Sequence, residues 1–119
     1  MNAKSLMLAS AVLACAGMPS FADTSGARIA LSNNYAGNSW RQAMLTSWET
    51  VTGPAVAAGT VAAADAFTTA ENQATEQAAQ IQNMILEGYN AIVINAASPT
   101  ALNGAVKEAC DAGITVVSF

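Results

Sequence analysis

The sequence predicts an α/β protein with a doubly wound parallel sheet, built from three β–α units plus a fourth strand. Short apolar runs alternate with helical patterns at a spacing of roughly 30 residues, and such alternation produces right-handed crossovers between parallel strands. Apolar residues make up 53% of the chain and charged residues 10%, which excludes disorder. A chain of 119 residues holds one domain at most.

The start of the chain predicts a secretory signal peptide, residues 1–22. Met1–Lys4 is positively charged, and residues 5–17 are apolar or small throughout. Small residues stand at the −3 and −1 positions before Asp23, as a cleavage site requires. The apolar stretch has about 13 residues, fewer than the ~20 that a bilayer span needs. We therefore expect export and a mature chain of residues 23–119.

A second cleavage site lies further upstream. Val12–Cys15 resembles a lipoprotein box, and its use would leave a lipidated Cys15. Either route exports the chain, so we expect a periplasmic location. Removal of Lys4 leaves three basic and eight acidic residues, a net charge of −5. Cys110 is then the one cysteine of the chain cleaved before Asp23.

The composition excludes several classes of function. Without His and with one mature Cys, the chain lacks the common zinc sites, His-based triads and an internal disulfide. A pI near 4.3 and the lack of any Lys/Arg run argue against nucleic acid. No G-x-G-x-x-G follows the first strand, and Lys107 stands late in a helix instead of in a phosphate loop. We expect neither a cofactor nor catalysis.

The first β–α unit starts with a strand at Arg28–Ser32, and its helix opens near Trp40. Ser39 and Gln42 have the spacing of a capping box. Gly53-Pro54 should end or kink this helix, because proline removes a donor and clashes with the preceding turn. The apolar face, with its tryptophan expected in the core, consists of Met44, Leu45 and Trp48.

The second unit has its strand within Val61–Thr69. Asn72 is suited to cap the next helix, which runs to Leu86. Gly88 suits the left-handed position that closes a helix. The apolar residues of this helix at helical spacing are Ala74, Ala78, Ile81, Met84 and Ile85.

The third unit starts with Ala91–Asn95, an apolar run typical of a strand buried on both faces. Ser98-Pro99 predicts an N-cap and first helical residue, and Gly113 ends this helix before a last strand at Ile114–Phe119. Nothing covers that strand, which predicts a fragment with a bare sheet edge. The helix face expected to be buried consists of Leu102, Ala105, Val106, Ala109 and Cys110.

Polar residues gather in the loops that follow the strands, Ser32–Arg41, Thr69–Asn72 and Asn95–Pro99. Ligands of open parallel sheets bind beyond the carboxyl ends of the strands. Amides match the donors and acceptors of sugar hydroxyls, an indole covers the apolar face of a sugar ring, and a guanidinium bridges two oxygens. The candidate ligand-binding residues are Asn34, Asn38, Trp40, Arg41, Glu71, Asn72, Asn95 and Ser98.

Structural roles compete for several of these residues. Asn38 or Ser39 can cap the first helix, and capping is the favoured role for Asn72 and Ser98. Glu71 can act as a favourable charge near a helix N-terminus. Trp40, in the first turn of a helix after a polar loop, is expected to be exposed.

The segments RIALSNNYAGNSW and ENQATEQAAQIQNMILEGYNAIVINAASPTALNGAVKEACDAGITVVSF resemble the type I periplasmic sugar-binding proteins of bacterial ABC importers, the ribose-binding group. The resemblance covers nearly all of residues 28–119. It implies two lobes of similar topology that close on a sugar, with an ABC permease in the membrane as partner. Residues 23–119 then correspond to an incomplete N-terminal lobe.

The resemblance also implies roles for single residues. Asn38 and Trp40 occupy the positions of the family's ligand-binding Asn and aromatic residue, and Arg41 stands where a second aromatic is common. The later loops contribute Glu71, Asn72, Asn95 and Ser98. The family's Asp after the fourth strand would lie beyond Phe119, and the second lobe and hinges are absent. We therefore expect the chain alone to fold poorly and to have little or no affinity for a ligand.

Two other functions share this fold. The effector domain of a LacI-type repressor would need a DNA-binding helix-turn-helix where the export signal stands. A secreted α/β enzyme, cut before its catalytic residues, would need a carboxylate or His pair in the sequence that follows.

Overall fold

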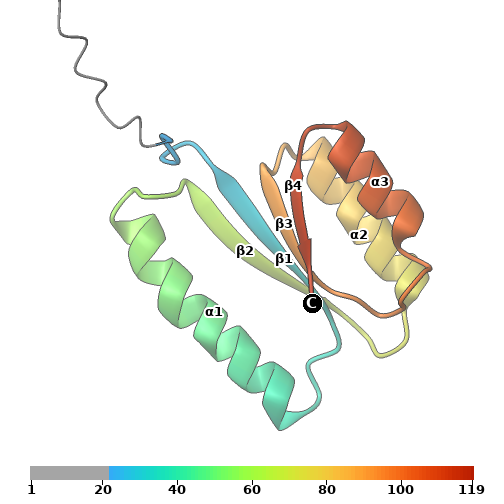
Figure 1. Cartoon of the computed structure of the whole chain (residues 1–119). Coiled ribbons are helices and arrows are strands. Elements are labelled where there is room, and N and C mark those ends of the chain that lie inside the picture. Colours follow the sequence, from blue (N-terminus) through green and yellow to red (C-terminus); the bar gives the residue numbers. More distant parts are fainter. Residues whose placement is uncertain (1–21) are drawn as a thin grey trace, which may run out of the picture.

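Four parallel strands form one sheet in the computed structural model, which describes residues 22–119. The predicted signal peptide, apart from Ala22, and the lipoprotein site at Cys15 lie outside these residues. The strand order is β2-β1-β3-β4, which confirms the predicted α/β class (Figure 1). The strands are β1 (Arg28–Asn34), β2 (Ala63–Thr69), β3 (Ala91–Asn95) and β4 (Thr115–Ser118).

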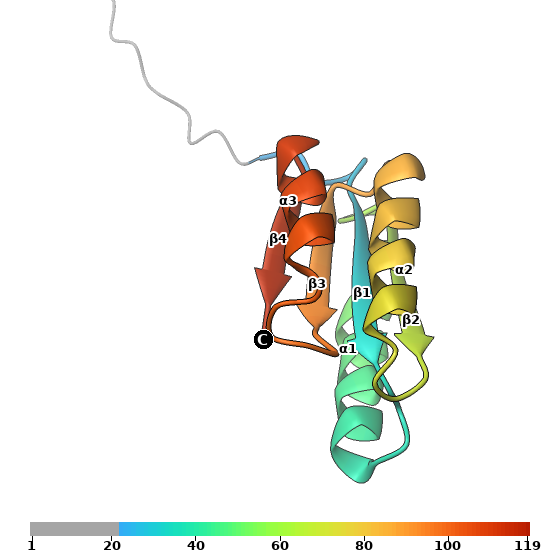
Figure 2. The same cartoon turned by 90° about the vertical axis from the view of Figure 1, so that its right-hand side faces the viewer.

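The three helices are α1 (Ser39–Ala57), α2 (Ala74–Leu86) and α3 (Asn103–Asp111). Figures 1 and 2 show α1 on one face of the sheet and the α2–α3 pair on the other. From β1 the chain turns toward α1, whereas from β3 it turns toward α3 on the opposite face. The carboxyl ends of β1 and β3 are therefore the topological switch point of this sheet, where open α/β folds bind ligands.

The core lies between the sheet and the α2–α3 pair. Ile81 of α2 and Ile92 of β3 are both 0% exposed. Among the helices of residues 22–119, α2 and α3 bury apolar side chains, and Leu102, just before α3, is buried with them. None of the 19 residues of α1 is buried. The main cluster consists of Ala30, Ile81, Met84, Tyr89, Ile92, Ile94, Leu102, Ala105, Ala109 and Ile114.

Strand pairing decides which side chains share a face. Leu31 pairs with Val93 and Asn33 pairs with Asn95, so these four side chains point to the same side of the sheet. Leu31 and Val93 line the groove beneath α1, which identifies that side as the α1 face. Asn33 and Asn95 thus lie at the end of the α1 face.

The helix α1 corrects two expectations. Its N-cap is Asn38, whose side-chain oxygen accepts from the backbone N–H of Arg41, and the capping box at Ser39 and Gln42 does not form. The helix also continues through Pro54 to Ala57, so of the two outcomes expected at Gly53-Pro54, an end or a kink, the end does not occur. Proline deletes one helical hydrogen bond, and because this part of α1 is exposed, water can reach the carbonyl that loses its partner.

The starts of α2 and α3 also differ from prediction. Gln73 is the N-cap of α2, while Asn72 has a φ of 59° and does not cap it. α3 begins at Asn103, four residues later than Pro99 predicted, because the Ser98 hydroxyl accepts from the N–H groups of Thr100 and Ala101 and closes a separate turn.

The ends of these helices follow the prediction. Gly88 and Gly113 have φ of 78° and 81°, the left-handed conformation that glycine adopts without strain. Cys110, in contrast, is exposed, although the helical spacing predicted burial. Ala109 fills the space against the sheet, and the next residue along α3 points outward. No helix within residues 22–119 is long and apolar enough to cross a bilayer.

Candidate ligand-binding site

Four buried side-chain oxygens without a hydrogen-bond partner within residues 22–119 stand at the carboxyl ends of three adjacent strands. They belong to Asn33 (0% exposed), Asn34 (8%), Thr69 (4%) and Asn95 (8%). An unpaired buried polar group costs about 1–3 kcal/mol, so most are paired in folded proteins. Their concentration at the switch point makes this edge the candidate binding site; we call these four residues the polar rim.

Asn33 has a fixed orientation. Its Nδ2 donates to the carbonyl oxygen of Tyr35 at 3.0 Å and to Oγ1 of Thr68 at 3.3 Å. The amide oxygen cannot exchange places with the nitrogen without losing the bond to the Tyr35 carbonyl, because that carbonyl oxygen only accepts. Because Asn95 is its neighbour on β3, two amides lie side by side at the end of the α1 face.

Asn34 and Thr69 extend the polar rim to the other face. They pair across β1 and β2, one position beyond the Asn33–Thr68 pair, so their side chains point away from α1. The polar rim thus continues around the edge of the sheet, from the end of β2 across β1 to β3.

The loop between β1 and α1 is held by its own side chains. Arg41 Nη1 donates to the carbonyl oxygens of Asn34 and Tyr35, and Gln42 Nε2 donates to that of Ala36 at 2.9 Å. Tyr35 has a φ of 81°, a conformation that costs a non-glycine residue about 1–2 kcal/mol. This network orders the loop in spite of that strain.

Gly37 makes room for the ring of Tyr35. A Cβ at this position would lie 2.1 Å from the Tyr35 hydroxyl oxygen, so any larger residue would displace the ring. The Arg41 guanidinium carbon is 5.9 Å from the centre of this ring and 6.0 Å from that of Trp40. Arg41 therefore links the two aromatic side chains of the loop through cation–π contacts.

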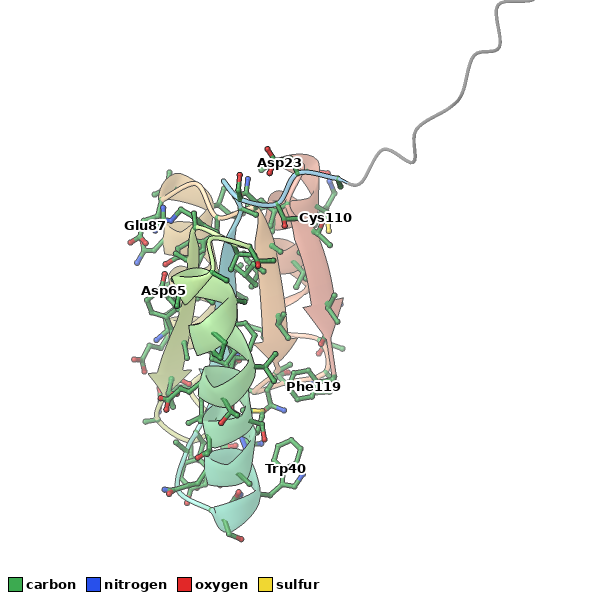
Figure 3. The ribbon with its side chains drawn as sticks, turned by 90° about the vertical axis from the view of Figure 1, so that its left-hand side faces the viewer. Asp23, Trp40, Asp65, Glu87, Cys110 and Phe119 are labelled. Atoms are coloured by element: carbon green, nitrogen blue, oxygen red, sulfur yellow. The ribbon has the colours of Figure 1, made fainter. Side chains whose placement is uncertain are left out.

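Trp40 lies in the first turn of α1 and is 57% exposed, so it does not belong to the core. Figure 3 shows its ring beyond the strand ends, on the same side of α1 as Phe119 and far from Cys110 and Asp23. Asn95 belongs to the same face of the sheet. Trp40 and Asn95 thus stand on one side, as a shared site requires.

The other predicted site residues have different surroundings. Asn38 and Ser98 use their oxygens to cap α1 and the turn before α3. Glu71 and Asn72 are exposed in the loop between β2 and α2, and neither side chain hydrogen-bonds within residues 22–119. Within the predicted set, Asn34 and Asn95 contribute buried unpaired oxygens, Trp40 an exposed ring, and Arg41 contacts with the loop's own carbonyls.

Asn33 and Thr69 are not in the predicted set, although both lie in the loops that the sequence placed at the strand ends. The sequence prediction ended the first strand at Ser32, whereas β1 extends to Asn34, and this extension pairs Asn33 with Asn95. If the alternation of the strand is continued beyond Leu31, Asn33 falls on the same face as Ile29 and Leu31. No group of three or more His, Cys, Asp or Glu side chains that could hold a metal ion occurs among the described residues.

The comparisons with known proteins agree with this architecture. The family model of the periplasmic binding protein domain matches residues 29–119, and the chain belongs to that family. A comparison with curated proteins finds no match.

Among solved structures, an ABC transporter solute-binding protein from Thermobispora bispora is 44% identical, with a TM-score of 0.75; the match covers 78% of this chain and 29% of that one. A periplasmic solute-binding protein from Actinobacillus succinogenes with bound D-allose is 20% identical, with a TM-score of 0.63, covering 77% of this chain and 30% of that one.

A solute-binding protein from Bacillus halodurans with bound myo-inositol is 20% identical, with a TM-score of 0.62, and the match covers 79% of this chain and 31% of that one. The last two structures share the fold. In all three comparisons the chain spans about three-tenths of the length of the protein it matches.

Proposed function

We propose that this chain forms one wall of the binding site of a periplasmic solute-binding protein that delivers a sugar or similar polyol to an ABC permease. The observation that carries the proposal is the polar rim at the switch point of the sheet. Membership of the periplasmic binding protein domain family supports it. The predicted signal peptide supports a location outside the cytoplasmic membrane.

The chemistry of the polar rim favours an uncharged ligand rich in hydroxyl groups. Asn33, Asn34 and Asn95 offer amides, which accept from and donate to hydroxyls, and Thr69 adds a hydroxyl of its own. Arg41 is engaged with the carbonyls of its loop, so it is not a free counter-charge for an anion. A neutral polyol satisfies the amides without requiring such a charge.

Trp40 supplies the apolar part of the site. Its ring is exposed on the side of the sheet on which Asn33 and Asn95 end, beyond the strand ends. An indole face covers the C–H groups of a sugar ring and excludes water from it. In this proposal the ligand lies against Trp40 while its hydroxyls reach the amides.

Binding, and not catalysis, is the proposed activity. A general acid or base would need a titratable side chain within hydrogen-bond reach of the ligand. The described members of the polar rim are amides and a hydroxyl, which do not titrate near neutral pH. Such a wall holds a solute by hydrogen bonds and contact, and a second lobe closing over it would complete the enclosure that tight binding requires.

A chimera tests the proposal. Residues 29–119 replace the matched part of the Thermobispora bispora protein, so that the 44% identical segment joins a complete second lobe. We expect calorimetry to detect saturable binding of at least one of D-ribose, D-allose, myo-inositol and glycerol. Gluconate and glucose 6-phosphate, which are anionic, should not bind.

Matched variants of the chimera locate the site. Asn95→Ala should weaken binding about tenfold or more, because it removes hydrogen bonds worth about 1.4 kcal/mol together. Asn83→Ala, on the exposed surface of α2, should leave the affinity unchanged. A chimera that melts cooperatively but binds none of the polyols would contradict the proposal, as would equal effects of the two variants.

A further inference from the structure

Gln77 of α2 is a fully buried polar side chain that makes hydrogen bonds to two strands. It is 0% exposed and lies beneath the polar rim, although the residue belongs to neither a strand nor a rim loop. A buried amide is tolerated only where its donors and acceptor find partners, so the contacts of Gln77 explain why it lies there.

The nitrogen of Gln77 joins β1 to β3. Nε2 donates to the hydroxyl oxygen of Ser32 at 3.0 Å and to the carbonyl oxygen of Asn95 at 3.0 Å, with the Ser32 carbonyl oxygen 3.3 Å away. Its two protons are thus directed to adjacent strands. The contacts lie where the ladder between β1 and β3 ends, at the Asn33–Asn95 pair.

The oxygen of Gln77 holds the loop after β3. Oε1 accepts from the backbone N–H of Ala97 at 2.8 Å. One side chain therefore satisfies the last carbonyl of β3 and an N–H two residues further on. Without Gln77, the carbonyl of Asn95 and the N–H of Ala97 would both lose their hydrogen-bond partner, at the point where the ladder between β1 and β3 ends.

We propose that Gln77 is a positioning residue, which sets the relative placement of Asn33 and Asn95 by holding the carboxyl ends of β1 and β3 together. It touches no ligand in this proposal; it acts through the strands that carry the two amides. The inference deepens the proposed polyol-binding function and rests on it for its purpose, but the placement itself can be measured without any ligand.

Amide hydrogen exchange on the whole chain, as purified from cells, measures that placement. In the wild type the Ala97 N–H should exchange slowly, because Gln77 is its partner. Gln77→Met keeps the approximate volume and removes all the hydrogen bonds. We expect it to accelerate exchange at Ala97 about tenfold or more, the equivalent of about 1.4 kcal/mol, and to shift the side-chain amide resonances of Asn33 and Asn95.

The control variant is Gln82→Met. Gln82 is the same residue type on the same helix, but it is exposed and donates to Glu108 on α3. It should leave Ala97 and both side-chain resonances as in the wild type. Core amides such as that of Ile92 should exchange at similar rates in both variants, because a positioning role is local to the end of the sheet.

Three outcomes overturn the inference. The first is fast exchange at Ala97 in the wild type, and this measurement does not depend on whether any variant folds. The second is equal acceleration at Ala97 and Ile92 in Gln77→Met, which assigns Gln77 a general stabilising role. The third is measurable polyol binding by the chimera whose affinity Gln77→Met leaves unchanged.

A titration with the same polyols separates this inference from the proposed function. If Gln77→Met frees Ala97 and shifts both asparagines, and the wild type binds a polyol about tenfold more tightly than the variant, both proposals are supported. If the exchange and resonance changes occur but no polyol binds the wild type or the chimera, the positioning role stands and the proposed ligand class is wrong.

Discussion

The two faces of the sheet differ in how closely helices cover them. On the α2–α3 face, side chains such as Ile81 and Ile92 are completely buried in one continuous cluster. On the α1 face, the 19-residue helix buries none of its residues, and Trp48, which the sequence placed in the core, is only half-buried. The comparison shows that a long helix with apolar residues does not by itself make a core.

The space between α1 and the sheet explains the difference. A groove of about 320 Å³ separates them, lined mainly by apolar side chains such as Leu31, Met44 and Trp48. Beside it, Val117 and Phe119 at the end of the chain are more than half exposed. Because burial of apolar area contributes about 25 cal/mol per Å², the free energy of folding is concentrated on the α2–α3 face.

The largest effect should come from truncating that packed face. Ile81→Ala should lower the free energy of unfolding by about 2–5 kcal/mol, because it leaves a cavity among fully buried neighbours. Val51→Ala, in α1 and 72% exposed, should change it by about 0.5 kcal/mol or less. Urea unfolding measures both, and similar losses would disprove the difference between the faces.

Alkaline pH should also act on the packed face. Burial, followed by the hydrogen bond that Tyr89 donates to Asp65 at 2.7 Å, raises the pKa of Tyr89 to about 12. An unfolded tyrosine loses its proton near pH 10, so the unfolded state binds fewer protons than the folded state above that pH. The stabilisation by Tyr89 is therefore complete below about pH 10 and is lost as the pH rises toward 12.

Melting curves from pH 8 to 12 measure this loss. The decline above about pH 10 should be smaller in Tyr89→Phe, which has no proton to lose. Tyr35→Phe, in the loop before α1, leaves Tyr89 in place and should keep the wild-type decline. Identical pH profiles for Tyr89→Phe and the wild type would show that Tyr89 is not the responsible group.

Two glycines should respond with opposite signs. Gly88→Ala forces a residue with a side chain into a φ of 78° at the end of α2 and should destabilise by about 1–2 kcal/mol. Gly104 lies inside α3 with open space around its Cβ position, so Gly104→Ala should stabilise by about 0.5–1 kcal/mol. Thermal melts of the two variants test this, and a loss of stability in Gly104→Ala would mean that α3 is not a regular helix there.

The smallest effect should come from the outer side of the packed face. Cys110 is exposed on α3, so Cys110→Ser should change stability by about 0.5 kcal/mol or less. For the same reason, a thiol reagent should modify Cys110 in the native protein without denaturant. If the thiol reacts only after unfolding, Cys110 is buried in the native protein, as the sequence predicted.

The order and type of the elements followed from the sequence alone. Apolar runs, helical spacing and the glycines at 88 and 113 are local signals, and the observed β3 coincides with the predicted Ala91–Asn95. The helix starts were predicted less well, because Asn38, Gln73 and Leu102 occupy N-cap positions that several nearby polar residues could have taken. Caps depend on the path by which a loop enters its helix.

The candidate site divides in the same way. That polar loops would gather at one edge was predictable, since parallel strands send their carboxyl ends to the same side. The roles within those loops were not. Arg41 and Asn38 were predicted to bind ligand, and in the structure their hydrogen bonds serve the loop and the helix cap.

By itself, the sequence determined the class of fold, the alternation of strands and helices and the edge at which polar groups meet, because hydrophobic periodicity and turn residues act over a few neighbours. Tertiary structure decided which amides are buried and which of them have hydrogen-bond partners. Asn33 meets Asn95 through strand register, and Gln77 reaches both strands from a helix. Such pairings join segments far apart in the chain, and only the folded sheet fixes their distance.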